Sequence, residues 1–140
     1  MKKKLSENLT LFKTSLYPYK TRFNSNKKHE LTLGIGGNVG DVKRTFHKLF
    51  LCLLKDSRFD ILITSPLLLN PPFGFLNQND FLNGIIVLKT NLSINAFFKS
   101  MQRYENRFKR TRSFKDAPRT LDIDIIFFAN KKINTKQLTI

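Results

Sequence analysis

The chain has 140 residues and carries 25 Lys and Arg against 10 Asp and Glu, a formal net charge of +15. This length suits one compact domain with a core of its own, and the charge indicates a polyanionic partner such as a nucleotide or a nucleic acid. A single cysteine excludes an internal disulfide, and no apolar run approaches membrane-spanning length, so we expect a cytoplasmic protein without a membrane partner.

Residues 1–29 are predicted to form a basic extension ahead of a domain that covers residues 30–140. The extension holds many lysines without a strong apolar period, and the run Tyr17-Pro18-Tyr19 breaks any helix. Residues 24–28 are polar and typical of a linker. We therefore expect a solvated arm that is free to flex.

The remaining residues alternate between strand and helix patterns. The patterns predict a strand at 31–35, a glycine-rich turn at 34–41, a helix from Val42 capped by Asp41, a strand at 59–64, a loop of turn formers at 70–74, a strand at 81–88, a helix at 94–108 and a strand at 119–128. This β-α-β-β-α-β order predicts a ferredoxin-like α+β sandwich, in which two helices pack on one face of an antiparallel sheet.

The last strand contains two carboxylates, Asp122 and Asp124, in an otherwise apolar run. Strand alternation places both on one face. Three apolar residues face the opposite way: Leu121, Ile123 and Ile125. Like charges on one strand face repel, so the pair favours a bound cation, and oxygen ligands suit Mg²⁺ held together with substrate phosphates. Polar residues on a solvated strand face are the alternative.

A dense basic cluster at 103–115 precedes this strand. Arg110, Arg112 and Arg119 flank the segment that enters it, and guanidinium groups beside Mg²⁺ are a usual means of stabilising phosphoryl transfer. Gln102 and Glu105 lie three residues apart on one helix face, off the apolar stripe. These two are candidates for contact with a nucleotide.

Phe81 and Asn83 share one face of the strand at 81–88. An aromatic ring beside an amide predicts a cradle for a flat heterocycle; a core Phe next to a strand-edge Asn is the alternative. The glycine-rich turn matches neither the dinucleotide fingerprint nor the phosphate-binding loop, and a tight turn explains its glycines as well as ligand contact does.

Five segments together resemble one family, the 6-hydroxymethyl-7,8-dihydropterin pyrophosphokinases of folate biosynthesis. They occur in the family's order and spacing between Leu31 and Ile140. The segments are Gly34-Ile-Gly-Gly-Asn38, Asn70-Pro-Pro-Phe-Gly74, Asp80-Phe-Leu-Asn83, Arg110-Thr-Arg112 and Pro118-Arg-Thr-Leu-Asp-Ile-Asp124. The resemblance implies transfer of pyrophosphate from ATP to the hydroxymethyl group of 6-hydroxymethyl-7,8-dihydropterin, with AMP leaving.

The resemblance also implies roles for single residues. Asp122 and Asp124 match the ligands of two Mg²⁺ ions that bridge the ATP phosphates, and Arg110 and Arg119 match the catalytic arginines. Five residues match contacts to ATP: Gln102, Glu105, Arg112, Ile125 and Thr139. Five more match the pterin pocket: Asn70, Pro71, Phe73, Phe81 and Asn83.

The chain departs from the family pattern in three places. Gly37 stands where the family usually has Ser, residues 112–119 lack the family's Trp, and the chain stops at Ile140 where the family continues with a tail that contacts the nucleotide. Two alternatives stay open. The missing tail suggests an inactive truncated paralogue, and the net charge of +15 with the basic extension suggests a ferredoxin-like RNA-binding module. Carboxylates on the sheet oppose the second, because they repel a phosphate backbone. We expect a monomer that acts on small molecules rather than on nucleic acid.

Overall fold

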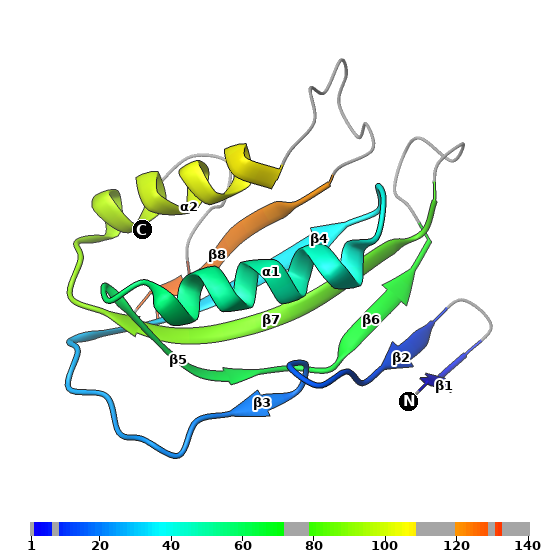
Figure 1. Ribbon diagram of the computed structural model, residues 1–140, viewed down its shortest axis with the longest axis horizontal. Helices are drawn as coiled ribbons and strands as arrows, with labels where there is room; N and C mark the ends of the chain where they lie inside the picture. Colours follow the sequence, from blue (N-terminus) through cyan, green and yellow to red (C-terminus); the bar gives the residue numbers. More distant parts are fainter. Residues whose placement is uncertain (1, 7–8, 72–78, 109–119, 129–130, 133–140) are drawn as a thin grey trace.

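The computed structural model describes residues 2–6, 9–71, 79–108, 120–128 and 131–132. Within them, nine strands form one sheet, and two helices cover one of its faces (Figure 1). The central elements are β4 (His29–Gly37), α1 (Val42–Lys55), β5 (Phe59–Thr64), β7 (Phe81–Thr90), α2 (Ile94–Phe108) and β8 (Asp122–Phe128).

The four central strands lie in the order β5-β7-β4-β8, and each neighbouring pair is antiparallel. Each helix connects two strands that are separated by one other strand in the sheet. This is the arrangement of a β-α-β-β-α-β sandwich, and the predicted ferredoxin-like α+β fold is confirmed.

The two helices form where the apolar period predicts them. Asp41 caps α1 by accepting a hydrogen bond of 3.2 Å from the Arg44 N–H. The apolar positions of α1 that recur every three or four residues are buried: Val42, Phe46, Leu49, Phe50 and Leu53. Leu51 and Leu54 lie outside this stripe and are exposed. Neither described helix has the length and apolarity needed to cross a membrane.

The glycine-rich segment predicted as a turn at 34–41 differs from its prediction, because its first half is strand. β4 continues to Gly37, and Gly40, with a φ of 74°, is the one described glycine whose φ is positive. A Cβ atom on Gly36 would lie 2.9 Å from the Asn83 Oδ1, and one on Gly34 would lie 3.1 Å from the Ile126 Cδ1. Glycine at 34 and 36 therefore permits a close approach of neighbouring side chains rather than a turn.

The described part of the N-terminal segment is not a solvated arm, which corrects the prediction. Three short strands occur there, β1 (Lys2–Lys4), β2 (Thr10–Phe12) and β3 (Tyr19–Lys20). β2 pairs with β6 (Leu67–Asn70), and β3 pairs with β5. Tyr17 is fully buried, and its hydroxyl donates a hydrogen bond of 2.9 Å to the Phe46 carbonyl oxygen. Strands of two or three residues leave no period that a sequence pattern can reveal.

A last short strand, β9 (Lys131–Lys132), pairs with β8 at the other end of the sheet. β8 thereby lies between β4 and β9 along Phe127 and Phe128, while the first part of the strand, from Asp122, pairs with β4 and lies near α2. The carboxylates of β8 lie in this first part.

Candidate active site

The two carboxylates of β8 lie on the face of the sheet that the helices leave open. Asp122 and Asp124 are half-buried, whereas the alternate residues Leu121, Ile123 and Ile125 belong to the core under the helices. The predicted alternation is confirmed. It also places the side chain of Ile125 in the core. The structure therefore does not bring that side chain to the carboxylates, although the family resemblance implies a contact between Ile125 and ATP.

The sheet register brings the carboxylates into line with Asn83. Gly36 of β4 lies opposite Asp122 on one side and opposite Asn83 on the other, and residues opposite one another share a face. Because Gly36 has no side chain, the carboxamide of Asn83 lies over its Cα. An amide and a carboxylate on non-adjacent strands thus face the same open surface.

Asn83 is joined to the end of β6. Its Nδ2 donates a hydrogen bond to the Asn70 Oδ1, and the Asn70 Nδ2 donates one of 3.0 Å to the Pro71 carbonyl oxygen. Phe81 lies opposite Asn70 in the β6–β7 register and is half-buried. The structure therefore brings together Asn70, Phe81 and Asn83, with Pro71 exposed at the margin.

A reciprocal pair of asparagines borders this surface, and neither residue was predicted from the sequence to belong to the site. The Asn38 Nδ2 donates to the Asn79 carbonyl oxygen at 2.9 Å, and the Asn79 Nδ2 donates to the Asn38 carbonyl oxygen at 3.3 Å. The pair ties the end of β4 to the segment that leads into Phe81. The sequence signal for it is slight, since Asn38 merely follows the glycine run.

Glu105 connects α2 to the carboxylate strand. Its Oε2 accepts a hydrogen bond of 2.6 Å from the Ile123 N–H, on the side of β8 that faces α2. Burial is the main cause that raises the pKa of Glu105 to about 7; the charges of Asp122 and Asp124 add to the rise, and the Ile123 hydrogen bond opposes it. Gln102, almost one turn earlier on α2, is exposed.

The remaining site residues that the sequence predicts lie outside the described residues. They are Phe73, Arg110, Arg112, Arg119 and Thr139.

The carboxylate oxygens of β8 fit a magnesium ion whose remaining ligands come from a bound substrate. In the described part of the chain, no three His, Cys, Asp or Glu side chains form a cluster that would hold a metal by themselves. Mg²⁺ is usually bound by one or two carboxylates together with substrate phosphates rather than by a closed protein cage. Asp122 and Asp124 are two carboxylates on one face of β8, a set of oxygen donors that fits this mode of binding.

A charged cluster fixes the part of α2 that carries Glu105. Asp56, just after α1, accepts hydrogen bonds from the Arg58 Nε at 2.9 Å and from the Arg58 Nη2 at 2.6 Å. The hydroxyl of Tyr104, the residue before Glu105, donates to the Asp56 Oδ2 at 2.8 Å. The Arg58 hydrogen bonds hold the pKa of Asp56 well below its usual range.

This cluster predicts a pH-dependent contribution to stability. Because the folded-state pKa of Asp56 is depressed, its contribution is fully present above the unfolded pKa of about 3.9. It shrinks progressively below that value and disappears only as the pH falls through the lower folded-state pKa, so it should be smaller at pH 3 than at pH 7. We expect Asp56→Asn to lower the free energy of unfolding by about 1–2 kcal/mol at pH 7, since it weakens hydrogen bonds to a charged group. Thermal unfolding of both proteins at pH 7 and pH 3 measures this.

The matched control for that measurement is Glu30→Gln, at an exposed position of β4. We expect it to change the melting temperature little at either pH, because exposed surface substitutions usually have small effects. A loss in Asp56→Asn that is equally large at pH 3 would contradict the ionic origin of the contribution.

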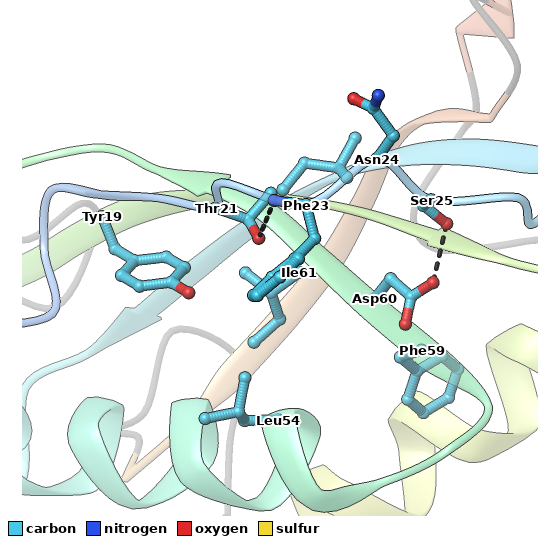
Figure 2. Close-up of a pocket in the computed structure, with 10 residues that line it drawn as sticks. Tyr19, Thr21, Phe23, Asn24, Ser25, Leu54, Phe59, Asp60 and Ile61 are labelled. Atoms are coloured by element: carbon cyan, nitrogen blue, oxygen red, sulfur yellow. Dashed lines mark hydrogen bonds between the residues drawn. The ribbon is translucent and has the colours of Figure 1, made fainter.

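A cavity of about 370 Å³ lies at the far end of the sheet from the carboxylates (Figure 2). Tyr19, Phe23, Leu54 and Phe59 line it together with Asp60. The Asp60 carboxylate is already engaged, by the Ser25 hydroxyl at 2.7 Å and the Lys27 Nζ at 3.4 Å. Asp60 lies opposite Lys89 on β7, six residues from Asn83, which is roughly 20 Å along a strand. This cavity is therefore separate from the carboxylate strand.

Comparison with known proteins identifies the family. Residues 32–140 match the model of the 7,8-dihydro-6-hydroxymethylpterin-pyrophosphokinase (HPPK) family. A 2-amino-4-hydroxy-6-hydroxymethyldihydropteridine pyrophosphokinase of Campylobacter jejuni is 41% identical over 119 residues, which cover 85% of this chain and 76% of the relative. One of Helicobacter pylori is 43% identical over 102 residues, 71% of this chain and 63% of the relative. One of Bacillus subtilis is 30% identical over 108 residues, 77% of this chain and 65% of the relative. With its fold, its carboxylate strand and these relatives, the chain belongs to the HPPK family.

Proposed function

We propose that this chain transfers a pyrophosphoryl group from ATP to the hydroxymethyl group of 6-hydroxymethyl-7,8-dihydropterin in folate biosynthesis. The observation that carries the proposal is the row of Asn83, Gly36 and Asp122 across three strands. It offers an amide for a flat heterocycle and carboxylates for metal-bound phosphates on one open surface. Membership of the HPPK family supports the same activity.

The reaction joins the two substrates without a covalent enzyme intermediate. The hydroxyl oxygen of the pterin attacks the β-phosphorus of ATP, and the bond from that phosphorus to the oxygen shared with the α-phosphate breaks. AMP leaves with that oxygen, and the proton of the hydroxyl passes to solvent. The work of the protein is to hold both substrates in line and to neutralise charge.

The proposed roles follow from the positions. Asp122 and Asp124 would hold two Mg²⁺ ions, which, when bound, neutralise the phosphate charge. Asn83, oriented by Asn70, reads the polar edge of the pterin beside Phe81. The other roles follow the family resemblance: Arg110 and Arg119 act on the transferred group, Gln102, Glu105, Arg112, Ile125 (through its backbone) and Thr139 contact ATP, and Pro71 and Phe73 line the pterin pocket.

The rival functions are less well supported. An RNA-binding module of this topology stacks bases on its open sheet face, where this chain carries Asp122 and Asp124. An inactive paralogue would share the fold and family, so measured turnover separates it from the enzyme.

We propose a cytoplasmic monomer, on the basis of its single cysteine and its small-molecule substrates.

A coupled measurement of products tests the proposal. The purified chain is incubated with ATP, Mg²⁺ and 6-hydroxymethyl-7,8-dihydropterin, and nucleotides are separated by chromatography. We expect AMP to form in equal amount to pterin pyrophosphate, and to require both the pterin and Mg²⁺. Formation of ADP, or of AMP without the pterin, would contradict the proposal. Metal-dependent binding of an ATP analogue without any turnover would favour the inactive paralogue, and tight, salt-resistant RNA binding would favour the RNA-binding module.

A further inference from the structure

The N-terminal hairpin, defined here as β1 and β2, lies beside the strand that carries Asn70. Thr10, Leu11 and Phe12 of β2 pair with Leu69, Leu68 and Leu67 of β6. On its other side, β6 pairs with the first residues of β7, up to Asn83. β6 is thus held between the hairpin and the strand that carries the amide (Figure 1). The family match begins only at residue 32, so it assigns no role to this hairpin.

The hairpin is fixed to the body of the protein by the segment that follows it. The Thr14 Oγ1 and the His47 Nε2 are 2.9 Å apart, and the Thr64 Oγ1 donates a hydrogen bond of 2.6 Å to the Leu16 carbonyl oxygen. Tyr17 is fully buried and hydrogen-bonded to the α1 backbone. These contacts join the segment to α1 and to β5, so β2 is held against β6 by more than its own three residues.

The row that contains Asn83 and Asp122 extends into the hairpin. Leu11 lies opposite Leu68, and Leu68 lies opposite Asn83. Together with Gly36 and Asp122, they form one row across five strands and on one face. A displacement of β2 would therefore be passed through β6 to the amide of the candidate site.

The hairpin also reaches the segment that leads into Phe81. The Lys43 Nζ lies 3.8 Å from the centroid of the Phe12 ring. Phe12 lines a cavity of about 360 Å³ with Leu69, Asn79 and Asp80. One side chain of β2 thus adjoins both segments that border the pterin side of the site, the end of β6 and the residues before β7.

We propose that the N-terminal hairpin is a positioning element for pterin binding, which holds Asn70 against Asn83 without touching the substrate. This inference rests on the proposed function. Without β2, the four residues of β6 would be an edge strand, and short edge strands open locally at low cost. Binding of a pterin would then have to order Asn70. The apparent affinity for the pterin would equal the intrinsic affinity multiplied by the fraction of molecules in which Asn70 is already ordered, so it would be lower than in the natural chain.

The test is calorimetry on a chain that lacks residues 1–13 and therefore keeps Tyr17 and its contacts. We expect the Kd for 6-hydroxymethyl-7,8-dihydropterin, measured with a non-hydrolysable ATP analogue and Mg²⁺ present, to rise about tenfold, which is about 1.4 kcal/mol. The Kd of the Mg²⁺–analogue complex alone, and kcat at saturating pterin, should stay within about twofold of their values in the natural chain. General destabilisation would not weaken pterin binding while leaving these two quantities unchanged. Phe12→Ala is the milder variant and should shift pterin affinity in the same direction.

The matched control is the double variant Lys3→Ala, Lys4→Ala, which removes two exposed charges of β1 and leaves the β2–β6 pairing intact. It keeps Lys2, whose Nζ lies 5.8 Å from the centroid of the Phe12 ring. We expect its two affinities to equal those of the natural chain. Unchanged pterin affinity in the folded deletion, or an equal loss for both ligands, would overturn the inference. If the deletion does not fold, Phe12→Ala decides by the same criteria. Failure of the natural chain to bind the pterin would instead refute the proposed function.

Discussion

Replacement of Asp122 or Asp124 by Asn is expected to lower turnover by at least about a thousandfold, equivalent to about 4 kcal/mol of transition-state stabilisation. Both carboxylates face the open side of the sheet and would hold the metal ions that neutralise the phosphates. The loss should appear in kcat over a range of Mg²⁺ concentrations. A variant with nearly normal turnover would refute the assignment of these residues to metal.

The same substitutions should leave the fold intact. Asp122 and Asp124 lie close enough to Glu105 to raise its pKa, so removal of one charge relieves repulsion in the metal-free protein. The melting temperature without Mg²⁺ should stay level or rise. Asp60→Asn is the matched control, because it removes a carboxylate from β5 at the far end of the sheet. It should leave turnover unchanged and lower stability slightly, since Asp60 forms an ion pair with Lys27.

Arg110→Ala and Arg119→Ala are expected to lower kcat by roughly a thousandfold or more, the range found for arginines that stabilise phosphoryl transfer. Their effect on the Kd of the pterin should be small, because they act on charge that develops in the transition state. Single-turnover kinetics together with pterin titration separates the two quantities. A loss confined to pterin affinity would show that the proposed roles are wrong.

Arg103→Ala provides the comparison for these arginines. Arg103 belongs to the same basic cluster and is exposed on α2. Its removal changes the net charge by the same amount, so it controls for general attraction of ATP to a basic surface. We expect it to change kcat less than twofold.

The elements in which an apolar pattern repeats several times were predictable from the sequence. The strand predicted at 59–64 has those same bounds in β5. The apolar positions from Ile94 to Phe108 that predicted the second helix all lie in α2, and Asp41 is the predicted cap of α1. Amphipathic helices of 14 and 15 residues repeat their apolar positions several times. The face of Asp122 and Asp124 was predictable for a similar reason, because alternation along a strand needs no knowledge of neighbouring strands.

Features that depend on pairing between strands were not predictable. The sequence suggested that the glycines at 34 and 36 form a turn, whereas they lie in β4 beneath the side chains of neighbouring strands. β6 and the strands before residue 21 are two to four residues long and were missed. The register that places Asn83 opposite Gly36 follows from the whole sheet, and no local pattern contains it.

The outermost strand on the β2 side has a consequence for how the protein behaves in concentrated solution. Among the strands that the structure describes, β1 is the last on that side, and its residues Lys2, Lys3 and Lys4 are all exposed. A free strand edge offers backbone groups with which a second molecule can continue the sheet. Two copies that meet edge to edge would bring three ammonium groups from each into contact. Because the range of that repulsion shrinks from about 10 Å at 0.1 M salt to about 3 Å at 1 M, high ionic strength removes the protection and favours aggregation through this edge.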